Sequence, residues 1–253
     1  MPMNEPEKFA PGQTLLIDAD DTLWENNIYF ERAIAAFISY LNHHEFSREE
    51  VREKLNEVER EHTKEHGYGV SSFRVSLVKC FERLSNEEMT PEKHERIVSF
   101  AQSITDQEIE LLPGVAETLS QLASRHRLIL MTKGNQAEQA DKLARSGLSS
   151  YFSAVEIPRE KNAEAYRSVC AKYDLKPHHA GAQNGVCTAE ACTAWMIGNS
   201  PRSDINPALA AGLHAIYIHH PSTWVLEHDE ISAPPEGQRL LEVDAFSNLI
   251  RHF

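Results

Sequence analysis

Three carboxylates and a hydroxyl are crowded into five positions directly after a short apolar run near the start of the chain. They follow residues 15–17, and they are Asp18, Asp20, Asp21 and Thr22. An apolar run without alternation is typical of a strand that is buried on both faces of a parallel sheet. Ligands of open α/β sheets bind beyond the carboxyl ends of the strands. The stretch therefore predicts an α/β core with a functional site at this strand end, although a solvated acidic turn would contain the same residues.

Asp18 and Asp20 lie two residues apart, so both side chains can face one site in extended backbone. One carboxylate could then act as a nucleophile while the other transfers a proton.

The charge balance excludes several classes of partner. The 253 residues contain 25 Lys and Arg against 38 Asp and Glu, a formal net charge of −13. Such an acidic chain is not expected to bind nucleic acid or an anionic membrane surface. No apolar run approaches the roughly 20 residues of a membrane span, and residues 1–13 contain no apolar segment of the signal-peptide type. We therefore expect a cytoplasmic protein.

Cysteines and histidines give no metal pattern. The spacing of the four cysteines matches neither a zinc motif nor a disulfide framework, and a cytoplasmic chain would keep them reduced. They are Cys80, Cys170, Cys187 and Cys192. The adjacent histidines at 43–44, 178–179 and 219–220 are most simply surface pairs.

Residues 28–112 have a helical period throughout. Apolar residues recur at helical spacing in four stretches, and no strand is evident. Ser47 and Glu50 form a capping box before the second stretch, and Thr90-Pro91 is a typical helix start before the fourth. Four helices with short connections predict an antiparallel bundle.

After Pro113-Gly114 the pattern alternates between strands and helices. Strands are expected at 128–131, 154–157, 195–197 and 215–218, the last being the final strand of the core, with helices at 115–124, 136–146 and 163–173 and one that begins at Ser200. Residues 178–194 are long for a loop and are expected to be an insertion, and the tail from Pro221 is expected to be irregular.

Four pieces of the chain resemble the haloacid dehalogenase superfamily and follow one another in its order. They are Asp18-x-Asp20-x-Thr22-Leu23, a strand ending in Thr132, a solitary Lys161, and Gly198-Asn199-x-x-x-x-Asp204. The resemblance implies a Rossmann-like α/β core formed by residues 1–26 and 112–253. It also implies an α-helical cap domain over 27–111, placed as a lid above the strand ends.

The resemblance implies a role for each matching residue. Asp18 would be the nucleophile that forms an aspartyl-phosphate, and Asp20 the general acid and base. Thr132 would contact the phosphate, and Lys161 would pair with both nucleophile and phosphate. Lys161 is preferred over its rivals Lys133 and Arg159 because it follows a strand and opens a helix.

A divalent cation is expected among these carboxylates, because two anions and a phosphate repel one another. Mg²⁺ prefers oxygen ligands and would offset that repulsion. By resemblance, its ligands are the Asp18 carboxylate, the Asp20 backbone carbonyl and Asp204. Asn199 stands where an aspartate is frequent; it can still ligate the metal or orient a bound water. Asp204 alone would equally suit the first turn of a helix.

The expected partner is a small phosphorylated metabolite. The residues expected to bind it or to gate its entry are Thr22, Trp24, Lys133, Gly134, Asn135 and Arg74. For Arg74, a solvated helix connection is the simpler explanation. The sequence indicates neither the particular substrate nor the oligomeric state.

The expected activity is Mg²⁺-dependent hydrolysis of a phosphomonoester. A 2-haloacid dehalogenase on the same fold is an alternative, but a halide needs no proton donor, so Asp20 argues against it. A phosphotransferase or mutase would pass the phosphoryl group to an alcohol. A catalytically impaired binding protein has only Asn199 in its favour.

Overall fold

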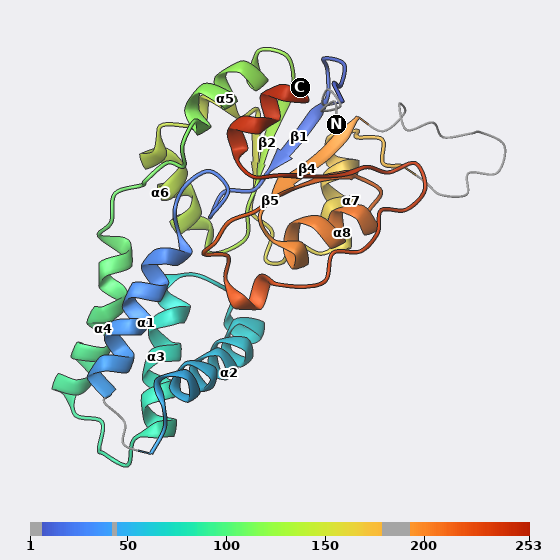
Figure 1. The fold of residues 1–253 in the computed structure, drawn as a ribbon. Helices are drawn as coiled ribbons and strands as arrows, with labels where there is room; N and C mark the ends of the chain where they lie inside the picture. Colours follow the sequence, from blue (N-terminus) through green and yellow to red (C-terminus); the bar gives the residue numbers. More distant parts are fainter. Residues whose placement is uncertain (1–6, 42–44, 179–192) are drawn as a thin grey trace, which may run out of the picture. The chain divides into compact units, whose positions relative to one another are not determined.

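The computed structural model describes residues 7–41, 45–178 and 193–253. The chain forms two compact units (Figure 1). The core unit comprises Met1–Glu25, Ile109–Lys133 and Gln139–Phe253, and the helical unit comprises Asn26–Glu108 and Gly134–Glu138.

The core unit is built on a six-stranded sheet in the order β3-β2-β1-β4-β5-β6, and every neighbouring pair is parallel. The strands are β1 (Thr14–Ile17), β2 (Arg127–Met131), β3 (Ala154–Glu156), β4 (Ala194–Gly198), β5 (His214–Ile218) and β6 (Leu240–Val243). The prediction of an α/β fold with a parallel sheet is therefore confirmed.

Both faces of the sheet are covered, which explains the continuous apolar run of β1. Leu15 and Ile17 pack on one face with α5 (Val115–Ala123), α6 (Gln136–Ser146) and the 3₁₀ segment Phe246–Arg251. Leu16 packs on the other face with α7 (Ala163–Lys172) and α8 (Asn206–Ala210) (Figure 1). Successive strand residues point to opposite faces, so a strand buried on both sides has no polar alternation.

The final part of the core differs from the prediction. β5 is not the last strand, because β6 pairs with it in parallel at the edge of the sheet. β6 was not predicted because three of its four residues are partly or fully exposed, and such an edge strand lacks the apolar signature of a central one. The predicted helix after Ser200 begins as a π-type turn, Pro201–Ile205, and continues as the short α8.

The helical unit contains α1 (Asn27–Leu41), α2 (Arg48–His66), α3 (Val70–Leu84) and α4 (Pro91–Thr105), which enclose a separate apolar cluster. The predicted caps are confirmed. Ser47 and Glu50 form a reciprocal capping box on α2, and Thr90 caps α4 with Pro91 in its first turn. These local signals located the helix starts because each satisfies an otherwise unpaired backbone N–H.

No helix among the described residues is long and apolar enough to cross a membrane. Cys80 and Cys170 are buried. Cys187 and Cys192 lie outside the described residues, as do His43, His44, His179 and most of the insertion expected over 178–194.

One carboxylate in the helical unit lies where a charge is unfavourable. Glu59 on α2 is 6% exposed, and its Oε2 has no hydrogen-bond partner. Burial raises its pKa from 4.5 to about 7, with Arg52 opposing the shift and Glu31 adding to it. The folded state thus holds the proton more tightly than the unfolded state. The stability contributed by the protonated form is complete below pH 4.5 and is lost as the pH rises through 7.

We expect Glu59→Gln to be more stable than the wild type at pH 8 by about 3 kcal/mol, and to gain little at pH 5. Gln keeps the shape of the side chain and remains neutral. Denaturant midpoints from pH 5 to 8 measure the difference. Glu65→Gln is the matched control, because Glu65 lies on the same helix with its side chain 77% exposed. A difference between Glu59→Gln and wild type that does not change with pH would contradict the prediction.

Candidate active site

The register of the parallel strands brings the predicted polar residues to one edge of the sheet. Ile17 pairs with Leu130 of β2 and with Ile197 of β4. The Asp18 N–H, just beyond β1, donates to the Ile197 carbonyl at 2.9 Å. The residues that follow these three strands therefore share the crevice where open α/β sheets bind ligands.

Lys161 joins two carboxylates at this edge. Its Nζ donates to Asp18 Oδ1 at 2.5 Å, to Asp204 Oδ1, and to the Met131 carbonyl at 3.3 Å. Lys161 is almost completely buried. Burial alone would lower its pKa, but Asp18 and Asp204 together raise the pKa above the usual lysine value. The ammonium therefore stays charged and holds both carboxylates.

Asp204 lies where the charge of its carboxylate is disfavoured. Burial, and then the charge of Asp18, raise its pKa from 3.8 to about 7, although Lys161 opposes this. Its Oδ2 accepts the Ser200 N–H at 2.9 Å. A Cβ at Gly198 would lie 2.3 Å from Asp204 Oδ2, so only glycine at 198 leaves room for this carboxylate.

The second oxygen of Asp18 is held by Thr22. The Thr22 hydroxyl donates to Asp18 Oδ2 at 2.9 Å and lies 3.3 Å from Asn199 Oδ1. The Asn199 amide donates to Thr223 Oγ1 at 2.9 Å. The hydrogen bond to Thr223 orients the Asn199 side chain, so that its oxygen lies towards the Thr22 hydroxyl.

Asp20 is surrounded by donors. Trp24 Nε1 and Gln139 Nε2 each donate to it at 2.8 Å, and Lys142 Nζ donates to both oxygens at 2.8 and 3.1 Å. Burial alone would raise the pKa of Asp20, but the Lys142 charge and these hydrogen bonds hold it below the usual range. Asp20 is thus an ionised acceptor in this structure. Trp24 is fully buried beneath it and supports Asp20, instead of standing at an entrance as expected of a gate.

A second ion pair lies next to the turn that carries Asp204. Lys133 Nζ donates to Glu227 Oε1 at 2.5 Å and to Ser203 Oγ at 2.8 Å, and the Ser200 hydroxyl donates to Glu227 Oε2 at 2.6 Å. Burial would raise the pKa of Glu227, but Lys133 and the two serines lower it. The sequence did not indicate Glu227, and Lys133 contacts it instead of Asp18.

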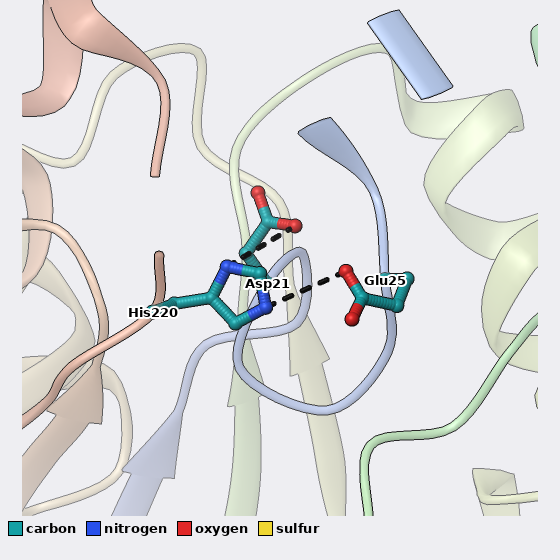
Figure 2. Close-up of side chains that lie close together, drawn as sticks. All are labelled: Asp21, Glu25 and His220. Carbon is teal, nitrogen blue, oxygen red and sulfur yellow. Dashed lines mark ion pairs between the residues drawn. The ribbon is translucent and has the colours of Figure 1, made fainter. Parts of the chain in front are cut away.

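Asp21, Glu25 and His220 form a third cluster, shown in Figure 2. His220 Nδ1 lies 3.9 Å from Asp21 Oδ1, and Nε2 lies 3.4 Å from Glu25 Oε2. The prediction of a surface pair is wrong for His220, whose side chain is only 8% exposed, whereas that of His219 is 55% exposed. The two histidines were expected to be equally exposed because they are adjacent in the sequence. Successive residues beyond a strand end can point to opposite sides, so one histidine is exposed and the other is buried.

The cluster has donors that suit a divalent cation. However, the Ser222 N–H donates to His220 Nδ1 at 3.3 Å. The proton of the neutral ring therefore lies on Nε2, facing Glu25. Burial lowers the pKa of His220 in spite of Glu25. Both ring nitrogens are engaged, and His220 links the loop after β5 to the turn after β1.

Four other predicted residues are less directly placed. Thr132 is buried directly after β2, and its N–H donates to the Glu156 carbonyl at 3.1 Å. Gly134 and Asn135 fall in the helical unit, where Asn135 Oδ1 caps α6. Arg74 on α3 donates to Gln102 on α4 at 2.6 Å. The catalytic role expected for Thr132 and the substrate-binding roles expected for Gly134, Asn135 and Arg74 stay predictions.

Comparisons with known proteins identify the family. The sequence model of the haloacid dehalogenase-like hydrolases matches residues 13–212. Human N-acylneuraminate-9-phosphatase is 30% identical over 109 residues, which are 43% of this chain but only 40% of that protein.

Solved structures agree with this match. A haloacid dehalogenase-like family hydrolase from Xanthomonas campestris has a TM-score of 0.72 and 28% identity, over 95% of this chain and 93% of its own. The L-2-haloacid dehalogenase from Xanthobacter autotrophicus shares the fold at a TM-score of 0.61 and 16% identity, over 95% of this chain and 97% of its own. With a family match over most of its length, this chain belongs to the haloacid dehalogenase-like hydrolases.

Proposed function

We propose that the chain is a Mg²⁺-dependent phosphatase that hydrolyses a small phosphomonoester through an aspartyl-phosphate on Asp18. The observation that supports this most is the buried Lys161 ammonium held between Asp18 and Asp204, with a second carboxylate at Asp20. The human relative is named a phosphatase, which favours the same chemistry.

Asp18 is prepared for nucleophilic attack. One oxygen pairs with Lys161 and the other accepts from Thr22, so the carboxylate is fixed in direction. Attack on phosphorus forms the Asp18–phosphorus bond and breaks the bond to the leaving oxygen. Lys161 then stands beside the transferred phosphoryl group, where a positive charge stabilises the negative oxygens.

Asp20 would move the protons of the reaction. It would protonate the leaving oxygen in the first half and take a proton from the attacking water in the second. In this structure its carboxylate is occupied by Lys142, Gln139 and Trp24. Protonation of Asp20 removes its negative charge and so weakens its ion pair with Lys142. When Asp20 takes up a proton, it therefore also separates more easily from Lys142.

The residues present fit Mg²⁺. Asp18 and Asp204 are buried oxygen donors, and burial together with the charge of Asp18 raises the pKa of Asp204 although Lys161 opposes this. Asp18, the Asp20 backbone carbonyl and Asp204 would hold the ion, with Asn199 Oδ1 beside Thr22. When bound, Mg²⁺ supplies charge that screens the carboxylates from the phosphate and stabilises the phosphoryl oxygens.

Chelation tests the proposed function. We expect phosphate release from p-nitrophenyl phosphate in Mg²⁺ to fall on the order of 100-fold or more in excess EDTA, because the ion contributes several kcal/mol to the transition state. Added Mg²⁺ should restore the rate. Undiminished phosphate release after chelation would overturn the metal requirement, and no release from a panel of phosphomonoesters in Mg²⁺ would overturn the phosphatase.

A 2-haloacid dehalogenase is the second candidate, and one observation favours it. Trp24, Gln139 and Lys142 all donate to the Asp20 carboxylate, which leaves it engaged in structural contacts. A carboxylate without a role in proton transfer would have such contacts. The same Asp18 would then displace a halide from carbon. Halide release from 2-chloropropionate in EDTA would support this candidate, and phosphate release that requires Mg²⁺ would exclude it.

A further inference from the structure

The segment between β5 and β6 contacts the loops that carry the proposed active-site residues. We call residues 220–232 the strap; they lie beyond the family match, which ends at residue 212. The strap accepts the Asn199 amide through Thr223 at 2.9 Å. It also reaches the residue after Thr132, through Glu227. The strap therefore contacts both the loop after β4 and the loop after β2.

Glu227 is the strap residue with the strongest contacts. Its side chain is 11% exposed, and its two oxygens go to different loops. Oε1 accepts from Lys133 Nζ at 2.5 Å, and Oε2 accepts the Ser200 hydroxyl at 2.6 Å. A buried carboxylate persists only with such charged or hydrogen-bonded partners. Glu227 thus ties the loop after β2 to the loop after β4.

Ser200 connects Glu227 to Asp204 through hydrogen bonds. Its Oγ accepts the Ser203 N–H at 2.9 Å, its carbonyl accepts the Asp204 N–H at 2.9 Å, and its own N–H donates to Asp204 Oδ2 at 2.9 Å. A serine hydroxyl has one proton. With that proton directed to Glu227, the lone pairs of Oγ remain for Ser203, which fixes the turn 200–204.

Lys133 closes the network from the other side. Its Nζ donates to Ser203 Oγ at 2.8 Å as well as to Glu227. The Ser203 carbonyl in turn accepts the Tyr166 hydroxyl at 2.8 Å. The turn that presents Asp204 is therefore held by the side chains of Lys133, Tyr166 and Glu227, which come from three separate segments.

We propose that Glu227 is a positioning residue of the active site. By accepting from Ser200 and Lys133, it fixes the turn 200–204 so that the Asp204 carboxylate meets Lys161 and Asp18 in the geometry that binds Mg²⁺. The proposal rests on the proposed function for Mg²⁺ binding at Asp18 and Asp204 and for its activity readout. Supporting groups that orient metal ligands typically contribute about 10- to 100-fold in metal affinity or activity.

Glu227→Gln tests the proposal, because the amide keeps the shape but loses the charge and one acceptor. We expect the Kd for Mg²⁺, measured by calorimetry, to rise about 10- to 100-fold. The kcat on p-nitrophenyl phosphate should fall by a similar factor with KM little changed. In metal-free protein, amide exchange of residues 200–205 should accelerate. Ser200→Ala should change the Kd, kcat and amide exchange in the same way. The double variant should lose no more Mg²⁺ affinity than the more impaired of the two single variants, because both act through one network.

Glu230→Gln is the matched control. Glu230 is an exposed strap residue that accepts from Asn206 only through its backbone carbonyl. The Glu230→Gln variant should bind Mg²⁺ with the wild-type Kd and hydrolyse p-nitrophenyl phosphate with the wild-type kcat. If Glu227→Gln binds Mg²⁺ with the wild-type Kd, and the amides of residues 200–205 exchange at the wild-type rate, the proposal is wrong. A lower melting temperature with unchanged Kd and kcat, which is the signature of a structural role, would also overturn it. If Glu227→Gln does not fold, Ser200→Ala decides by the same measurements.

The two proposals fail in different ways. A wild type that binds Mg²⁺ but releases no phosphate overturns the phosphatase, while the Kd and exchange comparison still decides the role of Glu227. A wild type that binds no Mg²⁺ overturns both.

Discussion

Asp18→Asn is expected to abolish phosphate release, with a loss of kcat of about 10⁴-fold or more, because an amide oxygen cannot form the covalent intermediate. The protein should remain folded. Lys161 keeps Asp204 as a partner, and removing the Asp18 charge removes the second cause of the raised pKa of Asp204, after burial. Steady-state release from p-nitrophenyl phosphate in Mg²⁺ measures the loss, with the melting temperature recorded alongside.

Asp21→Asn is the matched control for that experiment. Asp21 stands three residues further on in the same acidic stretch, with a φ of 59°. Asn tolerates this left-handed conformation, so the same change of charge is made without backbone strain. Because the Asp21 carboxylate lies 3.9 Å from His220 Nδ1 and has no role in the proposed chemistry, most of the activity should remain. Wild-type turnover in Asp18→Asn would remove Asp18 from the mechanism.

The sequence predicted the fold where the signals are local. β1 was predicted from three apolar residues, and the helices α2 and α4 from their caps, because these features depend on neighbours along the chain. β6 was missed because Leu240–Val243 is a short edge strand that is partly exposed. Its pairing with β5 depends on contacts that periodicity does not record.

The ordered motifs also predicted which residues gather at the strand ends. Lys161 reaches Asp18 and Asp204, whereas its rival Lys133 pairs with Glu227. The position of Lys161 at the opening of a helix was the signal that distinguished them. These residues lie together because the strands that precede them are parallel. Parallel strands bring their carboxyl ends to one edge of the sheet, whatever their separation in the sequence.

The supporting residues could not be predicted from the sequence. Lys142 and Gln139 are three residues apart on α6, a spacing that occurs in any helix, and only the tertiary structure aims both at Asp20. Glu227 lies in the tail from Pro221, where the sequence suggested irregular structure, and His220 precedes that tail and was predicted to be exposed. Charged residues that are buried by distant segments leave no local signature, so their roles become visible only in the fold.

Lys161→Met should cause the largest loss of stability. The substitution leaves the Asp18 and Asp204 carboxylates, whose side chains are 7% and 0% exposed, without their ammonium. Breaking a buried pair from one side costs about 3–5 kcal/mol, so we expect a deficit of that size at pH 8 in metal-free buffer. The folded-state pKa of Asp204, already near 7, would rise further. Stability is then recovered below that pKa and lost as the pH rises through it.

Lys172→Met provides the comparison, because Lys172 pairs with Glu156 at 2.7 Å but its side chain is 59% exposed. Exposed pairs contribute about 0–1 kcal/mol, so this variant should unfold near the wild-type midpoint at every pH. Denaturant titrations of both variants at pH 5.5 and pH 8 separate the loss of a buried cation from the loss of a long side chain. Equal and small effects at the two positions would show that Asp18 and Asp204 do not depend on Lys161, and the charge balance argued for the site would be wrong.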